Sequence, residues 1–171
     1  MGSRTPVVLL DLDGVLNPFA ASVCPEGYVE REVFDGEEPV RYCRAHTAWI
    51  AELASVAELW WATGWGRLAN DIYLPLLNAG NPQPLDPLPV VEFPPVPFEP
   101  ELKVAAIDDM LGDRPAAWID DNHTETGRMW ARERPVPTLL VSTDPAVGWT
   151  RPHVDQVVAW ISALGDHSRR R

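Results

Sequence analysis

The chain alternates between short, continuous apolar runs and longer stretches in which apolar residues recur every three or four positions. Short continuous runs are typical of strands that are buried on both faces of a parallel sheet, because neither face meets water. Helical spacing is typical of helices that pack one face on such a sheet. The apolar runs predict four strands, at Val7–Leu12, Glu58–Thr63, Ala116–Asp120 and Val136–Ser142.

Five stretches with helical character separate or follow the predicted strands. We expect the second of them to stop near Pro75, because a proline inside a helix removes a backbone hydrogen bond and crowds the preceding turn. The five predicted helices are His46–Leu59, Arg67–Leu74, Glu101–Leu111, Thr124–Glu133 and Pro152–Leu164.

Strands that alternate with helices predict an α/β fold with a parallel central sheet and right-handed crossovers. In such sheets, ligands bind at the carboxyl ends of the strands. Three predicted strands end in polar residues, within the strings "LLDLD", "WWATGW" and "AWIDDN". We therefore expect these three strand ends to face one crevice, which is the candidate functional site.

Residues 17–44 interrupt the alternation, because they lie between the first predicted strand and its helix. Within them, Tyr28–Tyr42 alternates in polarity and contains Asp35-Gly36, a pair typical of hairpin turns. We predict a small β-hairpin that covers the crevice as a flap. The insert is too short to be a separate domain, so we expect one domain over residues 1–171.

A proline-rich segment, residues 80–100, also stands outside the alternation. It contains eight prolines, which cannot donate the backbone hydrogen bonds of a helix or central strand. We expect this segment to be extended or looped, with room for one short strand at Pro89–Phe93.

Composition and charge narrow the function classes. The formal net charge is -11, which argues against nonspecific nucleic-acid binding, because that activity needs a basic face. No apolar run is long enough to cross a membrane or to form a signal-peptide core. We expect a cytoplasmic protein, and free thiols at Cys24 and Cys43.

Two pairs of aspartates stand at predicted strand ends: Asp11 with Asp13, and Asp120 with Asp121. Two carboxylates this close in the chain do not both ionise easily without a nearby cation. Magnesium suits such a site, because it prefers oxygen ligands and keeps several waters. The simpler interpretation is that Asp11 and Asp13 only cap the turn that begins at Gly14.

The string "DLDGVLN" resembles the first motif of the haloacid dehalogenase-like (HAD) superfamily. Thr63 at the end of "WWATG" resembles the second motif, Lys103 is placed like the third, and "WIDDN" resembles the fourth. The four motifs occur in family order within residues 7–122. The resemblance implies a three-layer, Rossmann-like fold, with the small flap in place of a large cap.

The family comparison implies a phosphoryl-transfer site. Asp11 would be the nucleophile that forms an aspartyl-phosphate. Asp13 would protonate the leaving oxygen and then activate water as a base. A dehalogenase has no use for such an acid, because halide leaves without a proton. Thr63 and Lys103 would stabilise the transferring phosphoryl group.

The same comparison implies a Mg²⁺ cofactor. Its ligands would be Asp11, the main-chain carbonyl of Asp13, and one acid of the Asp120-Asp121 pair. We favour Asp121 as the direct ligand and Asp120 as its support, although the reverse assignment stays open.

Four further residues are candidates for contacts in the site. Gly64 would offer a backbone N–H group to the phosphoryl oxygens, and Asn122 would orient an active-site acid. Arg67 would grip a second phosphate, or else lie on a surface helix. Trp65 would stack on a base, or else pack in the core.

A finer likeness concerns "DLDGVLNPF", "WWATGWGRLAN", "AWIDDN" and "PTLLVSTDPAVGWTRPHV". These strings resemble a small HAD family whose members are associated with RNA-repair enzymes. The resemblance implies a phosphomonoester hydrolase that acts on nucleotides or nucleic-acid ends, with a phosphorylated small molecule or such an end as its partner. Two alternatives stay open: a phosphotransferase of the same fold, and a module that binds a phosphorylated ligand or a partner protein without turnover.

Overall fold

The structure is a computed structural model that describes residues 5–94 and 97–169, without the side chains of 167–169. Its centre is a parallel sheet in the order β4-β1-β5-β6. The strands are β1 (Val7–Leu10), β4 (Glu58–Trp61), β5 (Ala116–Asp120) and β6 (Thr138–Ser142). All four predicted strands are therefore confirmed, three of them shorter than expected.

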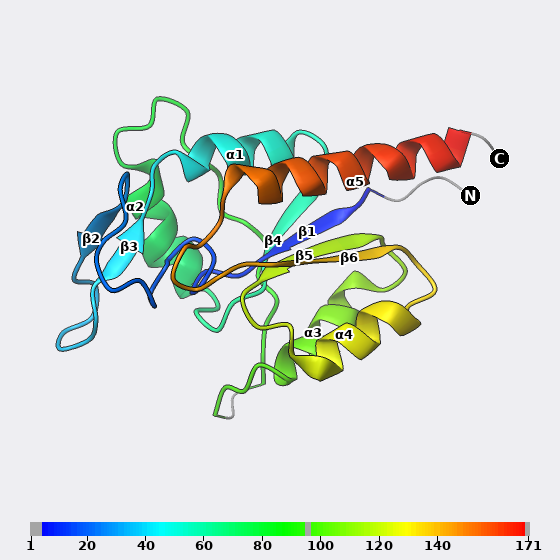
Figure 1. Ribbon diagram of the computed structural model, residues 1–171, viewed down its shortest axis with the longest axis horizontal. Coiled ribbons are helices and arrows are strands. Elements are labelled where there is room, and N and C mark those ends of the chain that lie inside the picture. Colours follow the sequence, from blue (N-terminus) through cyan, green and yellow to red (C-terminus); the bar gives the residue numbers. More distant parts are fainter. Residues whose placement is uncertain (1–4, 95–96, 170–171) are drawn as a thin grey trace.

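Helices cover both faces of the sheet and make a three-layer fold (Figure 1). One face carries α1 (His46–Ala54) and α5 (Arg151–Arg169). The other face carries α3 (Leu102–Leu111) and α4 (Thr124–Glu133). The predicted α/β fold class is confirmed. None of the helices in the described part of the chain has both the length and the apolar character needed to cross a bilayer.

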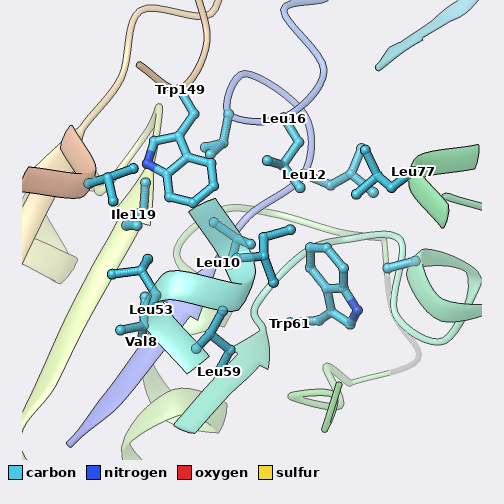
Figure 2. Close-up of a cluster of buried hydrophobic side chains, with 14 of the residues drawn as sticks. Val8, Leu10, Leu12, Leu16, Leu53, Leu59, Trp61, Leu77, Ile119 and Trp149 are labelled. Atoms are coloured by element: carbon cyan, nitrogen blue, oxygen red, sulfur yellow. The ribbon is translucent and has the colours of Figure 1, made fainter. Parts of the chain in front are cut away.

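The continuous apolar run of β1 follows from this sandwich. Successive side chains of a strand point to opposite faces, so both faces of a covered strand must be apolar. Val8 and Leu10 pack in the cluster under α1 and α5, which Figure 2 shows. Val7 and Leu9 pack in a second cluster, which includes Ile107 of α3. The strand that ends in Asp11 is thus anchored from both sides.

The register of the sheet aligns the ends of three strands. Leu10 of β1 lies opposite Trp61 of β4 and opposite Ile119 of β5. The backbone N–H of Asp11 donates to the Ile119 carbonyl at 3.1 Å, and that of Ala62 donates to the Leu10 carbonyl at 2.9 Å. The polar residues that follow each strand therefore begin at the same level of the sheet, as predicted.

The helix after β4 does not stop at Pro75. A π-helix, η1 (Ala69–Tyr73), runs directly into α2 (Leu74–Asn78), and Pro75 lies in the first turn of α2. The N–H of Leu74 reaches back to the Ala69 carbonyl, a spacing of five residues. The wider π-turn and the first-turn position both accommodate a residue without a backbone N–H. The predicted stop was therefore wrong.

The predicted hairpin is confirmed. Strands β2 (Val29–Arg31) and β3 (Val40–Tyr42) pair antiparallel, on the side to which the carboxyl ends of the sheet strands point (Figure 1). Gly36 has φ +74°, and the Glu37 N–H donates to the Phe34 carbonyl at 3.2 Å, so the Asp35-Gly36 turn is present. It lies inside a loop of eight residues, 32–39, because each strand is only three residues long.

The proline-rich segment adds a single bridge to the sheet edge. The Trp61 N–H donates to the Pro89 carbonyl, and the Val91 N–H donates to the Trp61 carbonyl, both at 2.8 Å. This pairs Val90 with Trp61 in parallel, so the short strand expected near Pro89–Phe93 is reduced to one bridge. Elsewhere in the fold, Cys24 and Cys43 are free thiols, as expected.

Candidate active site

Asp11 leaves β1 at the carboxyl edge of the sheet and is buried. Its Oδ1 accepts a hydrogen bond from the Leu12 N–H at 2.7 Å, and its Oδ2 accepts one from Lys103 Nζ at 2.8 Å. Burial raises the pKa of Asp11 above its usual range, Lys103 counteracts this, and Asp120 adds to it. The site therefore needs positive charge nearby to keep Asp11 ionised.

The turn after Asp11 requires a glycine. Gly14 has φ +76°, a backbone conformation that favours glycine. A Cβ atom on Gly14 would overlap the carboxyl group of Asp121. The bare glycine therefore lets the loop after β1 approach the loop after β5, which brings the two pairs of aspartates together.

Lys103, in the first turn of α3, joins two of these acids. Its Nζ lies 2.8 Å from Asp11 Oδ2 and 2.6 Å from Asp120 Oδ2, and the residue is only 3% exposed. Burial alone would lower the pKa of Lys103, but the two carboxylates outweigh it and the pKa is raised. Lys103 is also the only lysine in the chain. A compact ammonium with three donors suits a position between two carboxylates.

The two acids after β5 have different surroundings. Asp120 Oδ1 accepts from the Asn122 N–H at 2.8 Å, and its Oδ2 accepts from both Lys103 and the Trp118 indole. Asp121 is half-buried, and its pKa is raised. Burial is the larger cause, and the negative charge of Asp11 is the second. Asp120 is thus occupied by protein donors on both oxygens.

Three carboxylates gather where a cation would fit. One oxygen from each of Asp11, Asp120 and Asp121 lies within 4.8 Å of the others. The donor set is all oxygen, which suits Mg²⁺, and Lys103 offsets only one of the three acidic charges. The residues present therefore fit a divalent cation. The carboxylate of Asp13 is outside this cluster of described residues.

Asp13 faces a different set of donors. Its Oδ1 accepts from the Asn17 side-chain amide at 2.7 Å, and its Oδ2 accepts from the Trp65 indole N–H at 2.8 Å. Asn17 Oδ1 in turn accepts the backbone N–H of Arg41 in β3 at 3.0 Å. The sequence did not indicate either hydrogen bond. Trp65 lies 52 residues from Asp13 along the chain, and the bond from Asn17 depends on the conformation of the loop after β1.

Thr63 and Gly64 form the loop after β4. Thr63 is buried, and its Oγ1 accepts the Trp65 N–H at 3.3 Å. The Gly66 N–H donates to the Thr63 carbonyl at 3.0 Å, which closes a tight turn. Gly64 is exposed, and the Phe98 ring lies next to it. The centroid of the same ring lies 5.8 Å from Lys103 Nζ. The sequence did not single out Phe98.

Most of the candidate residues line a common cavity of about 420 Å³. Its lining includes nine of the ten residues that the sequence singled out for catalysis, metal binding or substrate contact: Asp11, Asp13, Thr63, Gly64, Trp65, Lys103, Asp120, Asp121 and Asn122. Arg67 is the exception. Its side chain is 80% exposed, pairs with Glu92 at 2.9 Å, and lines a separate cavity.

The comparison with protein families decides the assignment. The sequence model of the HAD domain in Swiss Army Knife RNA repair proteins matches residues 7–154. The chain belongs to this family. The HAD domain spans all four motifs and every residue that lines the cavity. The resemblance seen in the motifs is therefore confirmed. No curated protein matches the chain.

Proposed function

We propose that this HAD domain is a magnesium-dependent phosphomonoester hydrolase that works through an aspartyl-phosphate. The observation that carries the proposal is the buried Asp11, held by Lys103 beside two further acids at the floor of an open cavity. A carboxylate that is fixed, desolvated and flanked by positive charge is suited to attack a phosphoryl group.

The first half of the reaction transfers the phosphoryl group to the protein. An Asp11 oxygen forms the new bond to phosphorus while the bond to the leaving oxygen breaks. Asp13, which lines the same cavity, gives its proton to that leaving oxygen. Thr63 and Lys103 hold the phosphoryl oxygens, with the Gly64 backbone beside them.

The second half returns Asp11 to its free form. Asp13 takes a proton from water, whose oxygen then forms a bond to phosphorus as the bond to Asp11 breaks. Inorganic phosphate leaves with the water oxygen. Splitting the transfer into two steps lets one carboxylate act first as acid and then as base.

Asp11, Asp121 and the main-chain carbonyl of Asp13 would hold the cation. Asp121 is the better direct ligand, because both oxygens of Asp120 already accept hydrogen bonds from Lys103, Trp118 and Asn122. When bound, Mg²⁺ supplies positive charge that offsets the phosphoryl group and the carboxylates.

We propose nucleotides or nucleic-acid ends as substrates, in the cytoplasm. The family description, which refers to RNA repair, supports this class of substrate. The free thiols of Cys24 and Cys43 agree with a reducing compartment.

The test is phosphate release from a panel of phosphomonoesters, including p-nitrophenyl phosphate, nucleotides and phosphate-ended oligonucleotides, with and without Mg²⁺. The expected result is magnesium-dependent release that Asp11→Asn abolishes. Asp109→Asn, which removes one acid from an exposed position of α3, is the matched control and should keep the wild-type rate. Release that Asp11→Asn leaves unchanged would refute the proposal.

A further inference from the structure

A second cavity, of about 360 Å³, adjoins the one that holds Asp11. The two cavities share Asp13, Phe19 and Trp65. The outer wall of the second cavity comes from the loop between β2 and β3, including Phe34 and Glu37. A group bonded to a phosphoryl oxygen next to Asp13 would therefore extend into this second cavity, which we name the flap cavity.

The flap cavity has aromatic walls. Phe19 is 55% exposed and lines both cavities. The Phe34 ring packs against the Trp65 indole with centroids 5.4 Å apart and an angle of 51° between the planes. Exposed aromatic faces of this kind suit a planar ring system, because stacking removes their apolar surface from water.

The polar lining of the flap cavity is acidic. Glu37 and Glu38 are both exposed in the hairpin loop, and Asp13 lies at the junction with the first cavity. Carboxylates accept hydrogen bonds from hydroxyl and amino groups, and they repel a second anion. The wall is therefore suited to an uncharged group that carries hydrogen-bond donors.

The cation in the lining does not reverse this charge. The Arg41 guanidinium pairs with Glu30 at 2.8 Å and donates to the carbonyls of Pro18 and Ala21 at 2.9 and 2.7 Å. Its side chain is only 13% exposed. Arg41 thus fastens the hairpin to the loop after β1, and its charge is already matched by Glu30.

We propose that the flap cavity binds the leaving group and selects a nucleoside that carries no further phosphate. This inference rests on the proposed phosphatase function and deepens it. The base stacks on Phe34 and Phe19, and sugar hydroxyl or base amino groups donate to Glu37 and Glu38. A second phosphate on the leaving group meets the same two acids and is rejected, so a free mononucleotide is a better substrate than a polynucleotide end.

The experiment compares kcat/KM for adenosine 5′-monophosphate and adenosine 3′,5′-bisphosphate. In the bisphosphate, whichever phosphate reacts, the other stays on the leaving group. We expect wild-type protein to prefer the monophosphate by roughly tenfold or more, because of charge repulsion. The double variant Glu37→Gln/Glu38→Gln should lose most of this preference.

The matched control is Glu26→Gln/Glu32→Gln, which removes the same charge from exposed positions of the same insert, outside the flap cavity lining. It should keep the wild-type preference. Equal kcat/KM values in wild type, a preference that survives Glu37→Gln/Glu38→Gln, or faster release from a 5′-phosphorylated oligonucleotide would each overturn the inference.

Two further measurements separate this inference from the proposed function. Magnesium-dependent hydrolysis of p-nitrophenyl phosphate without any preference between the adenosine esters would refute the inference alone. Adenosine binding, measured by calorimetry, tests the cavity without turnover. We expect binding that Phe34→Leu weakens by at least about fivefold, because that change keeps apolar bulk and removes the stacking ring. Adenosine that does not bind, or that binds both proteins equally, would refute it.

Discussion

At the scale of single residues, the site combines one buried ammonium group with three carboxyl groups. Lys103, the only lysine of the chain, is buried between Asp11 and Asp120, and Asp121 completes the cluster. Removing one partner from a buried ion pair leaves an uncompensated charge, which is more unfavourable than the pair itself. The four residues therefore depend on one another for stability and for any chemistry they perform.

Asp13 has a separate role in this account. Its carboxylate bonds to Asn17 and Trp65 and is outside the cluster of described acids, so Asp13→Asn should leave Mg²⁺ affinity within about twofold. Turnover should fall by about 100-fold or more, because general acid and base catalysis is lost. Calorimetric titration of Mg²⁺ and steady-state kinetics test both expectations. Wild-type turnover in this variant would remove Asp13 from the mechanism.

Gly14 allows a second residue-scale prediction. Gly14→Ala adds a methyl group that overlaps Asp121, in addition to the strain of φ +76°. Gly36→Ala is the matched control, because its φ is +74° and nothing lies within 4 Å of the added atom. In both variants the free energy of unfolding should fall by about 1–2 kcal/mol, because alanine is strained at this positive φ. Only Gly14→Ala should also lose Mg²⁺ binding. Urea unfolding and calorimetry measure the two effects, and equal Mg²⁺ affinity in both variants would contradict the prediction.

At the scale of elements, one hydroxyl group adds to the hydrogen bonds of Asn17 and Arg41 that hold the hairpin against the rest of the fold. Tyr73, in η1, places its hydroxyl 2.9 Å from the Leu16 carbonyl and 3.0 Å from the Arg41 carbonyl. It therefore connects η1, the loop after β1 and strand β3. The position of this hydroxyl depends on the π-helix, which the sequence did not indicate.

Tyr73→Phe removes this connection and keeps the ring. We expect the free energy of unfolding to fall by about 1–3 kcal/mol, because the Leu16 carbonyl, which is buried, and the Arg41 carbonyl, which is partly buried, lose the one hydroxyl donor that they share. Amide hydrogen exchange of β2 and β3 should accelerate, while exchange of β1 and β5 in the central sheet should change only with the global stability. Uniform acceleration in all four strands would show that Tyr73 has no special connection to the hairpin.

The elements show where prediction from the sequence succeeds and fails. The four sheet strands were predictable, because burial on both faces leaves a continuous apolar run such as Val7–Leu10. The continuation of the helix past Pro75 was not predictable, because a proline in the first turn and a proline inside a helix look the same in the local sequence. The pairing of Asp13 with Trp65 and the separation of Arg67 from the cavity depend on loop conformations, which carry no periodic signal.

At the scale of the whole molecule, an aromatic cluster joins the hairpin insert, α1 and the loop before α5. His46 begins α1 and is buried against Tyr28, Trp49 and Trp149. Burial lowers the pKa of His46 to about 4. The folded protein therefore holds His46 neutral at pH values where the unfolded chain, with a pKa near 6.5, is already protonated.

Stability should consequently fall in mild acid. The part of the free energy of unfolding that depends on neutral His46 is fully present above pH 6.5. It is lost as the pH falls toward 4, because the unfolded state then binds a proton that the folded state does not. We expect a loss of about 2 kcal/mol between pH 7 and pH 5. Urea unfolding of wild type and His46→Phe at both values measures it, since the difference cancels the other titrating groups. An identical pH dependence in the two proteins would contradict the assignment.

The central claim is that Asp11 becomes phosphorylated. The most direct measurement is an acid quench during turnover of a ³²P-labelled phosphomonoester, followed by mapping of the label on the protein. The account predicts a label that hydroxylamine releases, as expected of an acyl phosphate, and that maps to Asp11 and is absent from Asp11→Asn. Turnover with no protein-bound label, or a label that persists in Asp11→Asn, would contradict it.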